Sequence, residues 1–195
     1  MRKIRDLLWP VALAFGLQLL PLVAGAGDIF DFIPSGGRTL LATALGAKPP
    51  PEALRAVLSA RRDRNAWLAY LRGQPKELPG MRGFSEREFA TLADYLAFNL
   101  PLAAADFSSS AWASRLPADG RDLALNYCQN CHVITVVVTQ DKSREAWLGT
   151  MHKPSHKEVK LTETQREALA AYLVVNAAIP VDQVPEDLRV GGASY

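Results

Sequence analysis

The 195-residue chain has few cysteines, little net charge and little strand-like alternation of polar and apolar residues. Its 22 basic and 20 acidic residues give a net charge of +2, too small for a nucleic-acid binder that depends on a strongly basic surface. Two cysteines are too few for a small protein held together by disulfides. A hydrophobic content of 49% argues against disorder. The composition indicates a globular protein with one ordinary domain or two small ones.

The first 26 residues have the order of a secretory signal peptide. Three basic residues within positions 2–5 precede an apolar stretch, residues 7–23, and the small-x-small cleavage site Ala24-Gly25-Ala26. The apolar stretch contains two prolines and falls short of the roughly 20 residues of a spanning helix, so an uncleaved membrane anchor is the second hypothesis. Cleavage after Ala26 leaves 19 of the 22 basic and 19 of the 20 acidic residues. We expect an exported, periplasmic protein with a neutral mature chain.

Proline and glycine clusters divide the mature chain into two helical regions, and an internal repeat relates them. Three segments recur in the same order: 37–40 at 120–123, 64–68 at 144–148, and 85–99 at 162–176. The last pair shares the pattern Glu-x5-Leu-Ala-x-Tyr-Leu-x-x-Asn. One segment, residues 133–139, is instead a β-branched run that favours extended structure.

Both copies of the last segment predict a helix with the same start signal. Ser85-x-x-Glu88 and Thr162-x-x-Gln165 are capping boxes, in which side chains accept from the free N–H groups at a helix start. Behind each box, apolar residues recur at helical spacing. They are Phe89, Leu92, Tyr95 and Leu96 in the first copy, and Leu169, Tyr172 and Leu173 in the second.

The motif with the most specific chemistry is Cys128-Gln129-Asn130-Cys131-His132. C-x-x-C-H is the attachment signature of c-type haem. Two thiols three positions apart can each join one haem vinyl group, and the adjacent histidine reaches the iron. The motif uses both cysteines of the chain. It also lies in a chain that we expect to be exported to where such haem is attached.

With this motif, residues 120–180 resemble the class I c-type cytochrome family of small bacterial electron carriers. Members run from a helix into C-x-x-C-H, through a loop bearing an axial methionine, to a closing helix. The resemblance implies a mainly α-helical, cytochrome c-like domain with one covalent haem c. Cys128 and Cys131 would anchor the haem and His132 would be the proximal iron ligand.

Met151 is the preferred candidate for the distal iron ligand. It follows Trp147 by four residues, so the two side chains share a helix face. Methionine opposite histidine raises the reduction potential of a haem relative to two histidines. His156 and His152 are the alternative distal ligands.

The repeat predicts a duplicated fold whose first copy lacks haem. Leu45, Lys48 and Pro49 occupy the positions of the two cysteines and the histidine. We therefore expect a signal peptide (1–26), a haemless cytochrome c-like repeat (27–105), a linker (106–119), a haem-binding domain (120–181) and a tail (182–195).

Other chemistry is open to the same residues. Cys128, Cys131, His152 and His156 form a possible tetrahedral zinc set, although the gap between its two pairs exceeds that of common zinc fingers. The two cysteines alone could form a thioredoxin-like redox site or a short disulfide. A haem without a distal protein ligand would suit a peroxidase-type enzyme.

The expected activity is single-electron transfer rather than catalysis by the chain itself. The protein would be a carrier, or the haem subunit of a periplasmic dehydrogenase or respiratory complex. Residues 142–160, which we call the basic segment, contain five Lys or Arg and two Glu. This charge could steer a redox partner that carries an acidic docking patch.

Overall fold

The computed structural model describes residues 28–103, 112–156 and 158–189 of the chain. The structure is mainly helical, as predicted, with 61% helix; the described ranges contain eight α-helices and no strand. In the same ranges, no helix is both long and apolar enough to cross a membrane. The predicted signal peptide and the middle of the predicted linker lie outside the described residues.

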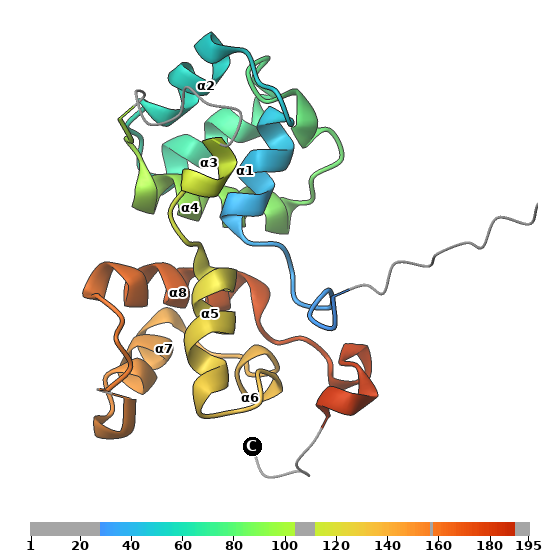
Figure 1. Ribbon diagram of the computed structural model, residues 1–195, viewed down its shortest axis with the longest axis vertical. Coiled ribbons are helices and arrows are strands. Elements are labelled where there is room, and N and C mark those ends of the chain that lie inside the picture. The colour runs from blue at the N-terminus through green and yellow to red at the C-terminus, as the bar shows by residue number, and fades with distance from the viewer. Residues whose placement is uncertain (1–27, 104–111, 157, 190–195) are drawn as a thin grey trace, which may run out of the picture.

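The helices form two groups, which Figure 1 shows one above the other. We call α1–α4 the first unit and α5–α8 the second unit. The first contains α1 (Gly37–Leu45), α2 (Pro51–Leu58), α3 (Arg64–Arg72) and α4 (Glu86–Asn99). The second contains α5 (Gly120–Tyr127), α6 (Thr135–Val138), α7 (Arg144–Met151) and α8 (Glu163–Asn176).

Each unit has its own apolar core. Trp67 is fully buried in the first core and Trp147 is 3% exposed in the second. The first core also receives Trp112 and Leu116 from the end of the predicted linker. The second core receives Ile33, which precedes α1 in the chain. Each core therefore receives residues from the segment that precedes the first helix of the other unit.

The predicted helix starts are confirmed. Ser85 is the N-cap of α4 and Thr162 is the N-cap of α8, and both form reciprocal capping boxes with the residue three positions on. All seven apolar positions predicted for the two helix faces are buried.

The prediction of extended structure for residues 133–139 is wrong. Thr135–Val138 forms the short helix α6. Ile134 and Val138 are buried in the second core, and the Thr135 hydroxyl donates to the Leu188 carbonyl. Burial of this face and contact with the tail outweigh the local β preference, which spans only about 1 kcal/mol.

A glycine–tyrosine contact joins the first and last helix of each unit. A Cβ on Gly37 would lie 2.1 Å from the Cβ of Tyr95, and a Cβ on Gly120 would lie 2.1 Å from the Cβ of Tyr172. Only glycine permits this approach. The same contact therefore fixes the crossing of α1 with α4 and of α5 with α8.

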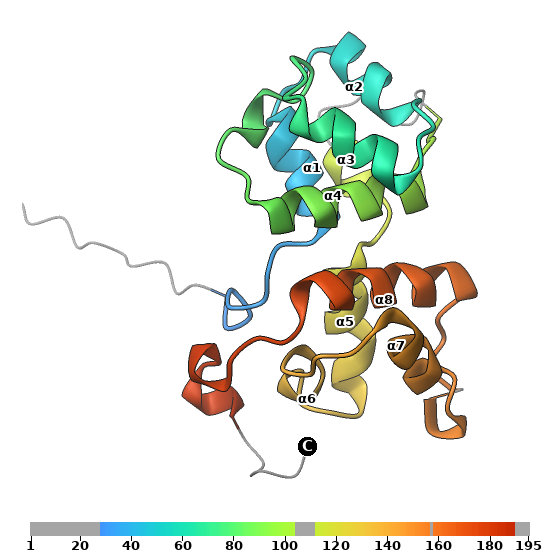
Figure 2. The ribbon, with the colours of Figure 1, turned by 180° about the vertical axis from the view of Figure 1, so that it is seen from behind.

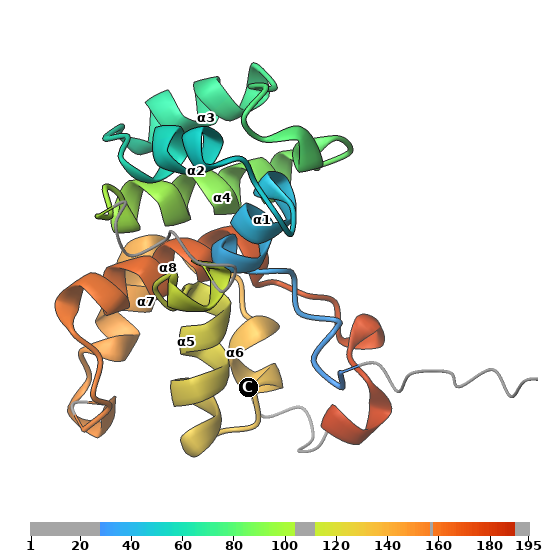
Figure 3. The same cartoon turned by 45° about the horizontal axis from the view of Figure 1, so that its top comes forward.

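The two tyrosines also link one unit to the other. The Tyr95 hydroxyl donates to the Pro117 carbonyl (2.9 Å), and the Tyr172 hydroxyl donates to the Pro34 carbonyl (2.6 Å). Each proline lies three residues before the first helix of the opposite unit. Burial raises the pKa of both phenols, so they remain protonated donors. Between these links, α4 and α8 pack against each other, as Figures 2 and 3 show.

Asp119 caps two helices with one carboxylate. It accepts from the backbone N–H of Asp122 in its own helix, α5 (3.0 Å), and from that of Arg38 in α1 (2.8 Å). A Cβ on Gly36 would lie only 2.1 Å from this carboxylate. The helix starts of the two units therefore meet at one buried side chain.

Candidate functional site

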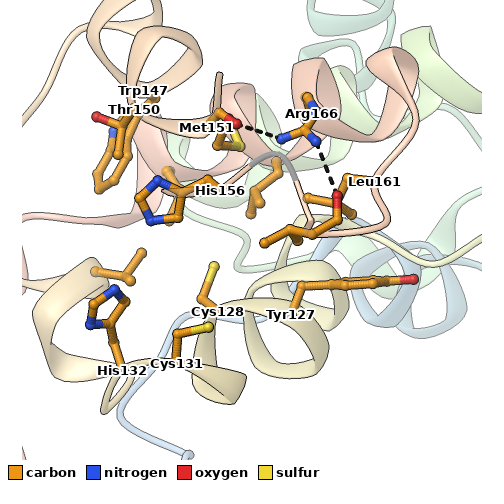
Figure 4. A pocket seen from close by; sticks show the side chains of 14 residues that line it. Tyr127, Cys128, Cys131, His132, Trp147, Thr150, Met151, His156, Leu161 and Arg166 are labelled. Atoms are coloured by element: carbon orange, nitrogen blue, oxygen red, sulfur yellow. Dashed lines mark hydrogen bonds between the residues drawn. The ribbon is translucent and has the colours of Figure 1, made fainter. Parts of the chain in front are cut away.

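The C-x-x-C-H motif forms a turn at the end of α5. The residues from Cys128 to Asn130 make one 3-10 turn, and the His132 N–H donates to the Cys128 carbonyl (3.3 Å). Asp119 and Gly120 fix the opposite end of the same helix. The turn places the two cysteines and His132 along one side of a cavity, shown in Figure 4.

The cavity encloses about 580 Å³ of space, part of it open to solvent. Apolar side chains from four elements of the second unit form most of its wall. They are Val137, Trp147, Val159, Leu161, Leu169 and Leu173. Cys128, Cys131 and His132 therefore line the same apolar cavity.

The environment of Cys128 disfavours the ionised form of its thiol. Burial raises its pKa to about 11, and the nearby Cys131 adds to the shift. Thioredoxin-like sites need the opposite, a thiol with a lowered pKa. Both cysteines are free in the structure. These properties are unlike those of a redox-active dithiol.

The three candidates for the distal iron ligand differ in whether they line the cavity. Met151, at the end of α7, and His156, in the 3-10 turn Pro154–His156, both line the cavity. His152 is exposed and does not line it. One ring nitrogen of His152 lies 2.8 Å from the Leu148 carbonyl, and the other lies 2.9 Å from Glu163.

The suggested zinc set is not assembled. His152 is directed to Glu163, away from the cysteines. Within the described ranges, no group of three or more histidine, cysteine or acidic side chains is arranged to hold a metal ion. The ring centres of His132 and His156 lie 6.2 Å apart.

Arg166 is a cavity residue that the sequence analysis missed. It lies on α8 and is only 6% exposed. Its guanidinium donates to the carbonyls of Met151 (2.7 Å) and Val159 (3.0 Å), which Figure 4 shows above the cysteines. In the sequence, Arg166 is distinguished only by comparison of the two repeats, because the corresponding residue of the first unit is the core residue Phe89.

Trp147 contributes an unpaired polar atom. Its indole N–H is buried and has no hydrogen-bond partner within the part of the chain that the structure describes, and the side chain lines the cavity. Leaving such a group unpaired costs about 1–3 kcal/mol. A ligand with an acceptor group would satisfy it.

The charges of the basic segment are partly used within the protein. Arg144 pairs with Glu167, and the Lys142 ammonium lies 4.7 Å from the centre of the Trp147 ring. Lys153 and Lys160 are exposed. The side chain of residue 157 lies outside the described part. The exposed lysines remain the candidates for partner docking.

Comparison of the chain with protein-family models, curated proteins and solved structures finds no match.

Proposed function

We propose that the protein is a c-type cytochrome that transfers single electrons through one covalent haem c. The observation that carries the proposal is the gathering of Cys128, Cys131 and His132 along one apolar cavity with further donor side chains on its opposite side. Each thiol would add its S–H across one haem vinyl group, which gives a thioether and releases no atom. His132 would bind the iron on the proximal side.

The residues that line the cavity are compatible with a bound haem. The apolar wall would cover the porphyrin face and keep water from it. The Trp147 N–H, which has no partner among the described residues, is a suitable donor to a haem carboxylate. Haem iron supplies a reversible one-electron couple, and ligands, burial and nearby charges set its potential.

Two side chains are candidates for the distal iron position. Met151 is the candidate from the sequence pattern, and His156 lines the same cavity. Binding by either one leaves no open position on the iron. Electron transfer is therefore favoured over peroxidase-type chemistry, which needs an open site for its substrate.

We further infer that the two units descend from one duplicated cytochrome c-like unit. Support comes from the matching order of the segments and from the equivalent glycine–tyrosine contacts of Gly37 and Gly120. In the first unit, Leu45 takes the position of Cys128 and is buried in the core. That unit would carry no haem. It would support α8 through α4 and offer surface to a partner.

The proposed setting is the periplasm, after cleavage of residues 1–26. The partner would be a redox protein, such as a dehydrogenase or oxidase, with an acidic patch that faces the basic segment. The haem protein would work as a free carrier or as a subunit of such a complex.

A reduced-minus-oxidised absorption spectrum of the exported protein tests the function. We expect the sharp bands of a six-coordinate c-type haem, reversible reduction, and slow binding of carbon monoxide to the reduced form. Rapid binding of carbon monoxide by all of the protein would favour the peroxidase-type alternative. The absence of haem bands would contradict both haem hypotheses.

A further inference from the structure

We propose that His156, rather than Met151, is the distal iron ligand, and that Arg166 is the residue that positions it. This inference rests on the proposed function, because it concerns the same haem site. It is carried by the separation of two histidine rings and by the hydrogen bonds that hold the loop between α7 and α8.

The separation of His132 and His156 suits a shared metal ion. An imidazole nitrogen binds a first-row metal at about 2.0 Å, and the ring centre lies about 1 Å behind that nitrogen. Two imidazoles on opposite sides of one ion therefore have centres about 6 Å apart. The observed distance is 6.2 Å, with 48° between the ring planes. Such rings can rotate about the axis that joins them, so this angle is compatible with shared binding.

The tautomer that His156 needs has local support. Its Nδ1 lies 3.4 Å from the Ser155 hydroxyl, which leaves Nε2 for a metal ion. Histidine ligands commonly use their second nitrogen in such a contact, which orients the ring. In the view of Figure 4, the ring of His156 lies between His132 and Met151.

The loop that carries His156 is held at both ends by one buried side chain. The Arg166 guanidinium donates to the Met151 carbonyl, where α7 ends, and to the Val159 carbonyl beyond the histidine. Within the loop, the His156 N–H donates to the Lys153 carbonyl (2.8 Å) and the Val159 N–H donates to the His156 carbonyl (3.1 Å). These bonds fix the backbone on either side of the imidazole.

Comparison with the first unit supports a specific role for Arg166. The corresponding residue there is Phe89, which is as well buried, at 6% exposure. An apolar side chain is therefore compatible with this position of the helix. A buried guanidinium is costly unless its hydrogen bonds are satisfied. It occurs in the unit that has a candidate ligand loop to hold.

The experiment compares ferric spectra of the intact exported protein and five variants: Met151→Leu, His156→Ala, His152→Ala, Arg166→Phe and Arg166→Lys. The pyridine haemochrome assay first measures covalent haem in each sample. If the unaltered protein has none, the proposed function fails. If it has covalent haem, every later result concerns the ligands alone.

For the ligand, we expect the unaltered protein to lack the long-wavelength methionine–iron charge-transfer band. Met151→Leu should keep the low-spin spectrum, and His152→Ala, outside the cavity, should keep both the low-spin spectrum and the reduction potential. His156→Ala should become high-spin and bind carbon monoxide rapidly when reduced. A charge-transfer band that Met151→Leu abolishes would overturn the assignment. The spectra of the unaltered protein and of Met151→Leu are sufficient for this test, so the test is valid even if His156→Ala fails to fold.

For the positioning residue, Arg166→Phe should keep its covalent haem and gain a high-spin fraction with faster carbon monoxide binding. Arg166→Lys, which can reach one of the two carbonyls, should recover part of the low-spin signal. A change in thermal stability alone, with spin state and carbon monoxide binding unaltered, would show that Arg166 only supports the fold and would refute its positioning role.

Discussion

Replacement of Asp119 by alanine should weaken the packing of the two units. The side chain is 3% exposed and accepts one backbone N–H from each unit, at Asp122 and Arg38. One helix cap contributes about 1 kcal/mol, and a buried donor left without an acceptor costs about 1–3 kcal/mol. We expect Asp119→Ala to lower the free energy of unfolding by about 2–4 kcal/mol. That is a large share of the total of about 5–15 kcal/mol typical of a folded protein.

Urea and thermal unfolding measure this loss. For a chain of this size, 1 kcal/mol corresponds to about 2–4 °C, so the melting temperature should fall by roughly 5–15 °C. Asp63→Ala is the matched control, because the Asp63 carboxylate caps only α3, through the Ala66 N–H. It should cost about 1 kcal/mol. An equal loss in the two variants would refute the double cap.

The pH dependence of the same site has a definite sign. Burial raises the pKa of Asp119, and the negative charge of Asp122 adds to the shift, while the two N–H donors and Arg38 oppose it. The folded protein therefore holds this proton to higher pH than the unfolded chain, whose aspartate pKa is about 3.9. The contribution to stability is complete below that value and is lost as pH rises through the folded-state pKa. As pH rises through the folded-state pKa of Asp119, the unaltered protein should lose stability relative to the Asp119→Asn variant. A gain in stability relative to that variant would contradict this expectation.

Three further changes test other parts of the account. Gly120→Val forces side-chain carbons into Tyr172 and should lower the free energy of unfolding in urea by about 1–3 kcal/mol. Gly149→Ala, where the added Cβ has open space around it, should leave that free energy unchanged. Equal effects of the two changes would exclude a tight α5–α8 contact. Trp147→Phe should shift the reduction potential in voltammetry by on the order of tens of millivolts, and Trp67→Phe in the first unit should not. Equal shifts would contradict a hydrogen bond from Trp147 to a haem carboxylate. Glutamine at the last three lysines of the basic segment should slow electron exchange with an acidic partner at low salt but not at high salt; rates that match at both salt concentrations would remove the docking hypothesis.

Local features of the fold could be predicted because their causes lie within a few residues. Ser85 and Thr162 each cap the helix that begins at the next residue, by accepting from the backbone N–H three positions on. The apolar residues behind them are buried, as their spacing indicates. The motif from Cys128 to His132 likewise brings its two cysteines and its histidine to one cavity. Short-range spacing is enough to identify such features.

Other features depend on contacts that a linear sequence does not display. Asp119 accepts from an N–H 81 positions away, so its role in α1 has no local sign. Arg166 resembles an ordinary polar residue of a helix until the folded loop brings two carbonyls to it. The β-branched residues around Val138 form a helix because the core and the tail select that conformation. The place of His156 beside the cavity likewise depends on how the loop closes.

The most direct test of the central claim is the amount of haem that stays attached to the denatured, acid-extracted chain. The pyridine haemochrome assay should find one haem per exported protein, with no free thiol. Substitution of alanine for both Cys128 and Cys131 should abolish the attachment. A protein that loses its haem on extraction, or that retains two free thiols, would contradict the proposal that this chain is a c-type cytochrome.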